Sequence, residues 1–331
     1  MLSIKEKVRR LYNKYGQRKA MGKSASNVRR PHYFLHRTFF GDQDLLIIFN
    51  TKRCSYNCDF CQLPAKSSRT WISGESIISQ FEYVIDQMKH SLSVLNRLTI
   101  SNEGSVLDTK TFPTEALLTI ARCAGELRLI RRIVLETRLE FVDTSVIQKV
   151  KETIPKATVN ILTGFETQDT HLRDKILFKK EPLDVFLNGL DRIAKTESEL
   201  TSYVLFKPSP TMTDMEAFTE AEKSINFLVE QCRTRSIPLS IRLNPMYVAA
   251  SSKWAKVAQD TPDYKPPRLT DVMELASKKT QEGVRIYIGL SGEGLDETWG
   301  NYMNRGDYSS DLIKYIKQFN DRKISSFEGI L

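Results

Sequence analysis

The sequence has 331 residues, which is enough for about two domains or for one α/β barrel of roughly 250 residues. It contains no apolar run near the ~18 residues that cross a bilayer, and its first residues lack a secretory leader, so we expect no membrane association. Five cysteines, three of them clustered, do not make a disulfide framework and suit a reducing compartment, which predicts a cytoplasmic protein.

Positive charge is concentrated at the start of the chain. The formal net charge is +9, and residues 1–30 hold ten Lys and Arg against the single acid Glu6, so the remaining chain is balanced. A basic arm beside a neutral body is typical of a segment that meets phosphates, in tRNA or in another anionic substrate. Two alternatives stay open: a solvated amphipathic helix packed on the body, or an organelle transit segment.

The elements expected along the chain alternate between strands and helices. Helical spacing over 4–15 is followed by a loop at 22–27. Short apolar runs then predict six strands, at 45–49, 97–100, 132–135, 157–162, 202–206 and 239–243. Between them, apolar residues recur at helical spacing and predict helices at 76–88, 113–126, 144–152, 183–194 and 215–233. This alternation favours parallel βα units and predicts a partial (β/α)6 TIM-like barrel.

The chain changes character after the sixth strand. A rigid turn at 264–268 leads to an expected helix at 270–279, a strand at 284–288 and a closing helix at 310–319, with a glycine-rich acidic stretch at 289–306. We therefore expect three parts. They are a basic helix and arm at 1–40, the barrel at 41–250, and an α/β extension at 251–331 that packs on the barrel.

Three cysteines follow the first predicted strand. Cys54, Cys58 and Cys61 have CxxxCxxC spacing, which lets one tight loop turn three thiolates toward one inorganic centre. If that centre is zinc, a fourth protein ligand must close the site, and His32 or His36 could supply it. If it is a 4Fe-4S cluster, one iron stays open for a substrate or cosubstrate. The remaining cysteines, Cys123 and Cys232, stand alone in predicted helices and are expected to be buried thiols.

Every predicted strand turns polar at its C-terminal end. In (β/α) barrels the functional face is this rim, so six polar ends would converge on one mouth. The polarity itself is expected wherever a strand gives way to a loop. The concentration of charge is not explained so simply, since five charged residues fall within a few positions of strand ends: Glu103, Glu136, Arg138, Glu166 and Lys207.

The cysteine loop, with Phe60 before its last cysteine and a run of βα units after it, resembles the signature of radical S-adenosylmethionine (radical SAM) enzymes. The resemblance implies that Cys54, Cys58 and Cys61 hold a 4Fe-4S cluster whose fourth iron is chelated by S-adenosylmethionine. It also implies an external one-electron reductant, whose electron cleaves the cosubstrate to a 5′-deoxyadenosyl radical that takes hydrogen from a substrate.

The same resemblance assigns further roles around the mouth. Phe60 would lie by the adenine, and Asn102, Glu103 and Gly104 stand where the family receives the methionine amino group, with Glu103 the stronger candidate. Ribose contacts are expected from Thr163 and Glu166, and adenine contacts near Phe206 and Asn244. The remaining rim charges are expected as substrate or cosubstrate contacts, namely Glu136, Arg138 and Lys207.

Within the superfamily, stretches from about residue 45 to 275 resemble the branch of the elongator catalytic subunit and, more narrowly, the radical subunit of archaeosine synthase. They include 102–108, 135–138, 163–167, 205–208 and 243–245. The resemblance implies action on a tRNA base or its amino-acid-like modification. Two other functions stay open: a radical enzyme of small-metabolite or peptide biosynthesis, and a zinc-stabilised RNA-binding protein.

Overall fold

The computed structural model describes residues 27–61, 67–127, 129–246, 248–249, 252–290, 301–302 and 309–330. The expected helix at 4–15 and most of the glycine-rich acidic stretch, at 291–300 and 303–306, lie outside these residues. In the described part of the chain, no helix is long and apolar enough to cross a membrane.

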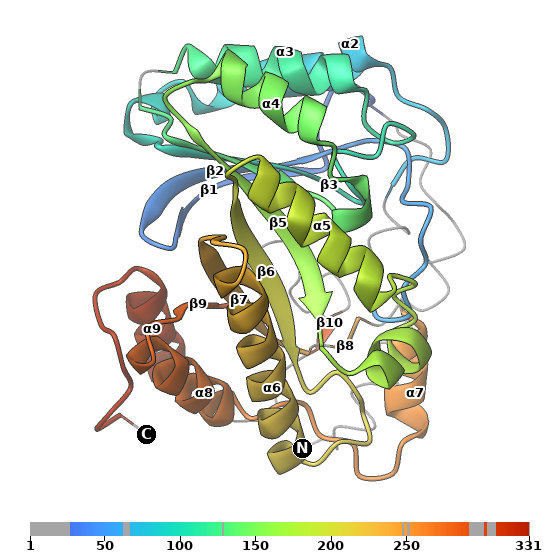
Figure 1. The fold of residues 1–331 in the computed structure, drawn as a ribbon, viewed down its shortest axis with the longest axis vertical. Helices are drawn as coiled ribbons and strands as arrows, with labels where there is room; N and C mark the ends of the chain where they lie inside the picture. Colours follow the sequence, from blue (N-terminus) through green and yellow to red (C-terminus); the bar gives the residue numbers. More distant parts are fainter. Residues whose placement is uncertain are drawn as a thin grey trace.

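A curled sheet of eight strands forms the centre of the molecule (Figure 1). The strand order is β1-β2-β3-β4-β5-β6-β7-β9, in which β1 pairs with β2 antiparallel and each later neighbour is parallel. The sheet is therefore a partial α/β barrel, as the sequence predicts. Its strands are β1 (Tyr33–Phe39), β2 (Asp42–Phe49), β3 (Arg97–Asn102), β4 (Arg132–Glu136), β5 (Thr158–Glu166), β6 (Glu199–Phe206), β7 (Leu239–Pro245) and β9 (Arg285–Ile288).

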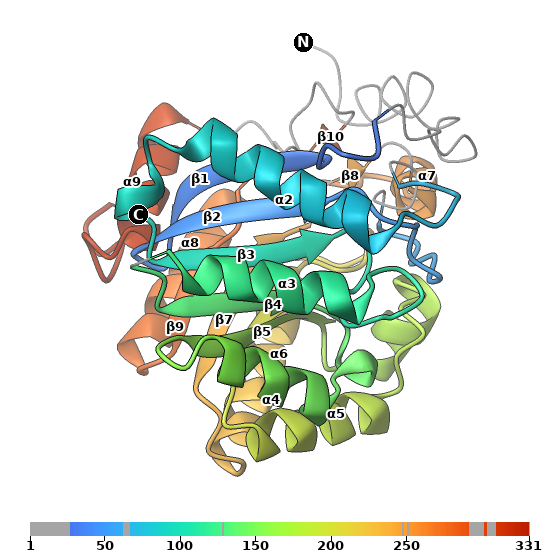
Figure 2. The ribbon, with the colours of Figure 1, turned by 90° about the horizontal axis from the view of Figure 1, so that it is seen from above.

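Most of the helices cover the convex face of this sheet, whereas α7 lies beyond the carboxyl ends of the strands (Figure 2). Several begin at a side-chain cap that satisfies a free backbone N–H: Ser73 caps α2, Asp143 caps α4, and Thr213 forms a capping box with Glu216 at α6. The helices are α2 (Gly74–Met88), α3 (Thr114–Gly125), α4 (Thr144–Thr153), α5 (Leu183–Lys195), α6 (Asp214–Arg233), α7 (Lys253–Asp260), α8 (Leu269–Gln281) and α9 (Ser310–Asn320).

The two-residue alternation of the strands separates the core from the barrel interior. On β2, Leu45, Ile47 and Phe49 are buried in the hydrophobic core, whereas Leu46 and Ile48 line a cavity inside the barrel. The same strand thus supplies both packing and cavity wall. Because the other strands alternate in the same way, the carboxyl ends of the sheet surround one interior space.

The sheet has two more strands than the predicted six. The predicted strand at 284–288 is β9, which pairs with β7 and continues the barrel sheet. β1 was not predicted, because its sequence mixes His, Arg and Thr with apolar residues and no helix follows it. Instead, a tight turn leads into β2, with Phe40 at φ 53 and Gly41 at φ 87. α7 was also not predicted. The expected division of the chain into residues 1–40, 41–250 and 251–331 stays a prediction.

Candidate active site at the carboxyl ends of the strands

A cavity of about 280 Å³ opens among the carboxyl ends of the strands. It is lined by the cysteine loop, by residues of β1 through β7 and by Gly289 and Leu290 directly after β9. Most residues that the sequence nominated meet here, which is the convergence expected of a barrel rim. Those that line it are Cys54, Cys58, Phe60, Cys61, Asn102, Glu103, Gly104, Glu136, Arg138, Thr163, Glu166 and Asn244.

Backbone hydrogen bonds fasten the cysteine loop to distant parts of the chain. The amide of Asp59 donates to the carbonyl of Leu177 at 2.8 Å, and the amide of Trp254 donates to the carbonyl of Asp59 at 2.9 Å. The Cys54 sulfur accepts from the amide of Tyr56 at 3.4 Å, and the Cys58 sulfur lies 3.9 Å from the Lys179 carbonyl. The loop therefore has a defined path that brings three sulfurs to the cavity wall.

Two nearby cations favour the ionised forms of the thiols, against the effects of burial and of neighbouring acidic groups. Burial raises the pKa of the Cys54 thiol, while the Tyr56 amide and the charge of Arg138 act to lower it. Burial also raises the pKa of Cys58, and Lys179 and Arg138 oppose that shift. An anionic group bound by these sulfurs would gain from the same two cations.

Arg138 joins the cysteine loop to the segment after β5. Its guanidinium carbon lies 3.7 Å from the centre of the Tyr56 ring, and it donates to the carbonyls of Lys179 at 2.9 Å and Lys180 at 3.0 Å. It also donates to Glu140 at 3.1 Å, and Tyr56 donates its hydroxyl to Glu140. Burial and this carboxylate raise the pKa of Tyr56 to about 12, so its hydroxyl stays protonated. The structure therefore gives Arg138 a positioning role.

The residues expected to receive the methionine amino group surround Cys54. Glu103 is 3% exposed; its Oε2 lies 3.2 Å from His32 Nε2 and makes no hydrogen bond with the described residues. A side chain at Gly104 would place its Cβ 3.3 Å from that of Cys54, so the glycine lets the β3 loop approach the cysteine loop closely. The Gly104 amide donates to the Asn102 side chain at 3.0 Å, which holds this turn.

The possible ligands around the cysteine loop distinguish the two expected centres, zinc and a 4Fe-4S cluster. Within the described ranges, no three His, Cys, Asp or Glu side chains are gathered closely enough to hold an ion. His36, one proposed zinc ligand, lies on β1 with its Nε2 2.9 Å from Gln43 Oε1, and His32 contacts Glu103. A 4Fe-4S cluster binds its thiolates on separate irons, so they need not meet at a single ion, and three thiols that line one cavity beside two cations fit such a cluster better.

Buried charges lie along the wall next to Cys58. Lys179 Nζ is 3.8 Å from Glu166 Oε1 and 3.3 Å from Glu181 Oε2, and Arg173 is 3.1 Å from Glu181. Burial raises the pKa of Glu166, with Lys179 and Arg173 acting the other way. Burial also acts to raise the pKa of Glu181, but Lys179 and its neighbouring arginines hold it below the usual range. Glu166 and Lys179 thus present a partly neutralised polar pair to the cavity.

One polar group of cavity-lining residues was largely missed by sequence reasoning. Glu136 is partly buried and accepts hydrogen bonds from the hydroxyls of Ser101 and of Tyr203, the latter at 3.3 Å, and the charges of Arg242 and Arg37 influence it. Burial raises the pKa of this carboxyl. Arg37 comes from β1, a strand that was not predicted. Arg242 and Tyr203 lie inside strands, whereas the sequence analysis nominated residues at strand ends, such as Glu136. A mid-strand charge facing inward was the available signal.

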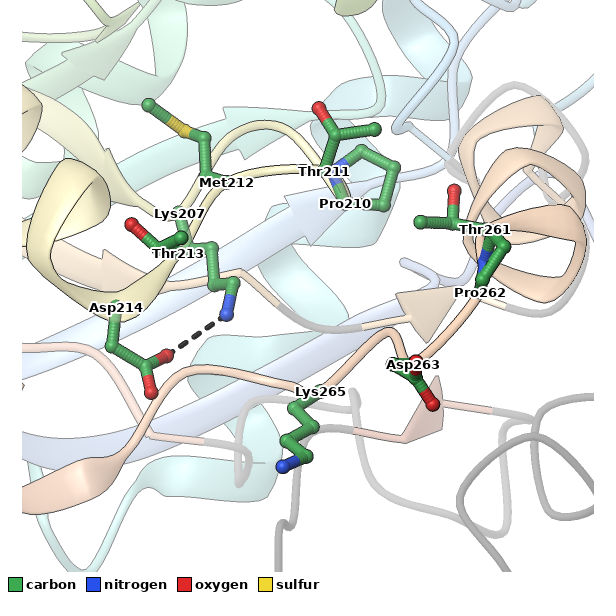
Figure 3. A pocket seen from close by; sticks show the side chains of 10 residues that line it. All are labelled: Lys207, Pro210, Thr211, Met212, Thr213, Asp214, Thr261, Pro262, Asp263 and Lys265. Carbon is green, nitrogen blue, oxygen red and sulfur yellow. Dashed lines mark hydrogen bonds and ion pairs between the residues drawn. The ribbon is translucent and has the colours of Figure 1, made fainter.

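Two nominated residues do not line this cavity. Phe206 is wholly buried in the core, where its ring lies 6.4 Å from that of Phe218, and Leu205 takes the cavity-facing position on β6. Lys207 lies in a separate surface cavity beyond β6, with its Nζ 2.9 Å from Asp214 (Figure 3). The remaining lining of that cavity is Pro210, Thr211, Met212, Thr213, Thr261, Pro262, Asp263 and Lys265.

Comparison with known proteins finds distant relatives of this chain. It is 26% identical over 278 residues to an uncharacterized protein of Methanocaldococcus jannaschii, covering 82% of this chain and 74% of that protein. It is 22% identical over 270 residues to the archaeosine synthase subunit beta of Thermococcus kodakarensis, covering 81% of this chain and 80% of that subunit. No protein-family model matches the sequence.

Among solved structures, methylornithine synthase (PylB) is similar, with a TM-score of 0.52 and 15% sequence identity over 100% of this chain and 94% of that chain. At this identity the likeness concerns the fold. It agrees with the partial α/β barrel that the sequence predicts. The fold, the cysteine motif and the distant similarity to archaeosine synthase subunit beta together support the assignment that we propose below.

Proposed function

We propose that this protein is a radical SAM enzyme and that it holds one 4Fe-4S cluster through Cys54, Cys58 and Cys61. We further propose that it acts on a tRNA base or its amino-acid-like modification. The observation that carries the proposal is the convergence of the three sulfurs with Glu103 and Glu166 on one cavity at the carboxyl ends of the strands. When bound there, the cluster and S-adenosylmethionine would supply a 5′-deoxyadenosyl radical by one-electron cleavage of the sulfonium.

The chain's own residues would orient the cosubstrate. Glu103 offers a buried carboxylate oxygen without a hydrogen bond in the described structure, which suits the methionine ammonium. Thr163 offers a buried hydroxyl in the same condition, which suits a ribose hydroxyl. Phe60 lines the cavity next to the last cysteine and provides a ring face for the adenine. The Thr163 hydroxyl would gain its partner from the cosubstrate, and the ammonium would join His32 at the Glu103 carboxylate.

Arg138 and Lys179 would keep the cysteine loop in place and offset the negative charge that the thiolates bring. Arg138 holds the loop through its contact with the Tyr56 ring, and Lys179 lies beside Cys58. The cavity wall also limits water: Leu46, Ile48 and Leu162 present apolar side chains to its interior. Such shielding suits radical chemistry, since it protects a reactive species from side reactions.

The tRNA target is supported by two independent features. Archaeosine synthase subunit beta, whose name refers to a modified nucleoside, is 22% identical over 270 residues. The first 30 residues carry ten Lys and Arg, which suits a phosphate-rich partner. A small-metabolite or peptide substrate is the second candidate, favoured by the polar groups around Glu136 in the lining of the cavity.

Analysis of iron, sulfide and zinc in anaerobically purified protein tests the cluster. We expect iron and sulfide, and dithionite-reduced protein should form 5′-deoxyadenosine from S-adenosylmethionine. Zinc without iron would instead support a zinc-stabilised RNA-binding protein and overturn the radical assignment.

Deletion of residues 1–26 tests the basic arm. If the arm contacts phosphates, tRNA binding should weaken and its dependence on salt should flatten by about 0.7 to 0.9 per lost contact. Unchanged tRNA binding would favour a small substrate.

A further inference from the structure

A basic surface with an exposed tryptophan lies beside the cysteine loop. Three segments of the rim, 27–31, 50–58 and 67–73, contain five Lys or Arg residues and no Asp or Glu. Within them Trp71 is 49% exposed, although large aromatic side chains are usually buried. We call this surface the rim patch, and it consists of Arg29, Arg30, Lys52, Arg53, Arg69 and Trp71.

Gln80 brings the first two segments together. Its side-chain amide donates to the carbonyl of Val28 at 2.8 Å and to the carbonyl of Asn50 at 2.9 Å, and it accepts from the Asn50 amide at 2.8 Å. Gln80 is wholly buried on α2, so this connection is part of the folded core. The guanidinium of Arg30 lies 4.8 Å from the centre of the Tyr83 ring, also on α2. The basic pair at 29–30 is therefore held next to the end of β2.

A short parallel pairing joins the second and third segments. Lys52 pairs with Ser68, the amide of Arg53 donates to the Ser68 carbonyl at 2.8 Å, and the Ser68 amide donates to the Thr51 carbonyl at 3.2 Å. Arg69 follows Ser68 directly, and Trp71 comes two residues later. This pairing therefore fixes the backbone that carries the exposed side chains of Arg53, Arg69 and Trp71, and the first of its two segments leads directly into Cys54.

We propose that the rim patch binds a single-stranded segment of RNA and presents it to the cavity. Arginines interleaved with an exposed aromatic ring match the two demands of such a ligand, which are phosphate neutralisation and stacking of an unpaired base. An unpaired segment is required because a base inside a duplex could not enter the cavity. This inference rests on the proposed function, of which it specifies the substrate-docking surface.

Binding of unmodified tRNA transcripts to the full chain, measured by fluorescence anisotropy over a range of salt, tests the proposal. Trp71→Ala should weaken binding roughly tenfold, and Trp71→Phe, which keeps an aromatic face, should bind nearly as the wild type does. The double change Arg53→Gln and Arg69→Gln should reduce the salt slope by about 1.4 to 1.8, as expected for two phosphate contacts.

A matched control removes two exposed charges elsewhere, by Lys149→Gln on α4 and Arg233→Gln on α6. The control should leave both affinity and salt slope unchanged. Equal losses in the control and rim variants, or wild-type binding by Trp71→Ala, would overturn the proposal. Iron content and cleavage of S-adenosylmethionine without RNA are measured in parallel. Their failure in the wild type would contradict the proposed function, whereas normal cleavage with unaltered RNA binding in the rim variants would contradict only the docking surface.

Discussion

The two ends of the barrel use buried charge in opposite ways. At the amino ends of the strands, Asp44 accepts hydrogen bonds from Arg37 Nε at 2.9 Å and from the Thr99 hydroxyl at 2.8 Å, and Arg132 lies 2.8 Å from Glu199. At the carboxyl ends, the Thr163 hydroxyl makes no hydrogen bond with the described residues, and Glu103 Oε2 makes none although His32 Nε2 lies 3.2 Å away.

This difference separates groups that hold the fold from groups that await a ligand. A buried ion pair whose members are satisfied by each other contributes to the folded state but has nothing left to bind. A buried polar atom without a hydrogen bond destabilises the fold until a partner arrives, so it is retained where binding supplies that partner. Changes at the amino ends should therefore affect stability, and changes at the carboxyl ends should affect binding.

The largest contrast is expected between cysteines on and off the rim. Cys58→Ala should abolish cluster loading, because only two thiolates would remain on the loop. Cys123→Ala, in α3, should retain the iron and sulfide of the wild type. Both are measured by metal analysis and by the visible absorption of reconstituted protein. Full iron content in Cys58→Ala would show that the cysteine loop does not hold the cluster.

At the opposite end, Asp44→Ala should lower the free energy of unfolding by about 3–5 kcal/mol, because it leaves a buried guanidinium without its partner. Asp44 is fully buried, and it accepts hydrogen bonds from Arg37 Nε at 2.9 Å and from the Thr99 hydroxyl at 2.8 Å. Urea unfolding measures the change. The control Asp191→Ala, which breaks an exposed pair with Arg235, should cost less than about 1 kcal/mol. Similar losses of unfolding free energy in Asp44→Ala and Asp191→Ala would show that the buried pair stabilises the fold no more than the exposed pair does.

Glu103→Gln should weaken binding of S-adenosylmethionine while leaving stability nearly unchanged. Loss of a charged hydrogen bond costs about 1.5–3 kcal/mol, whereas the contact of Glu103 Oε2 with His32 at 3.2 Å does not meet hydrogen-bond geometry and a glutamine oxygen can replace it. Calorimetric titration of reconstituted protein measures the affinity, with Glu82→Gln on exposed α2 surface as the control. Wild-type affinity in Glu103→Gln would show that the amino group binds elsewhere.

The smallest expected effect is on the pH dependence of stability. Burial raises the pKa of Glu136 above its ordinary value of 4.5. The folded protein then keeps this proton to a higher pH than the unfolded chain, so the free energy of unfolding falls as pH rises from about 4.5 to the raised pKa. Glu136→Gln removes this contribution and should show a shallower decline in urea unfolding across that window. An identical pH profile would mean that Glu136 does not titrate differently on folding.

Most of the fold was predictable because parallel strands and helices differ in apolar period. All six strands predicted for the barrel occur, and polar residues after them marked the cavity, as Glu103 and Thr163 show. Phe206 was expected at the cavity but lies in the core, because alternate residues of a strand face the interior. The sequence alone did not determine which of positions 205 and 206 faces inward. Burial and contact with Phe218 decide it.

Other site residues were hidden by their local context. Arg37 lies in an antiparallel strand outside the βα repeat, and Arg242 lies inside a strand whose sequence reads as packing. Lys179 follows a π-helical turn, Leu172–Ile176, where no periodic pattern places a side chain. Its approach to Cys58 depends on tertiary contacts that local sequence does not encode.

The fastening of the cysteine loop sets an order for building the enzyme on the ribosome. Asp59 bonds to Leu177 and Trp254, so the loop gains its support only after about 200 further residues have been made. Until then the three thiols belong to a nascent chain without the barrel behind them. Insertion of the proposed cluster would therefore follow synthesis of most of the chain, and a truncated product ending before Trp254 would expose these thiols to oxidation.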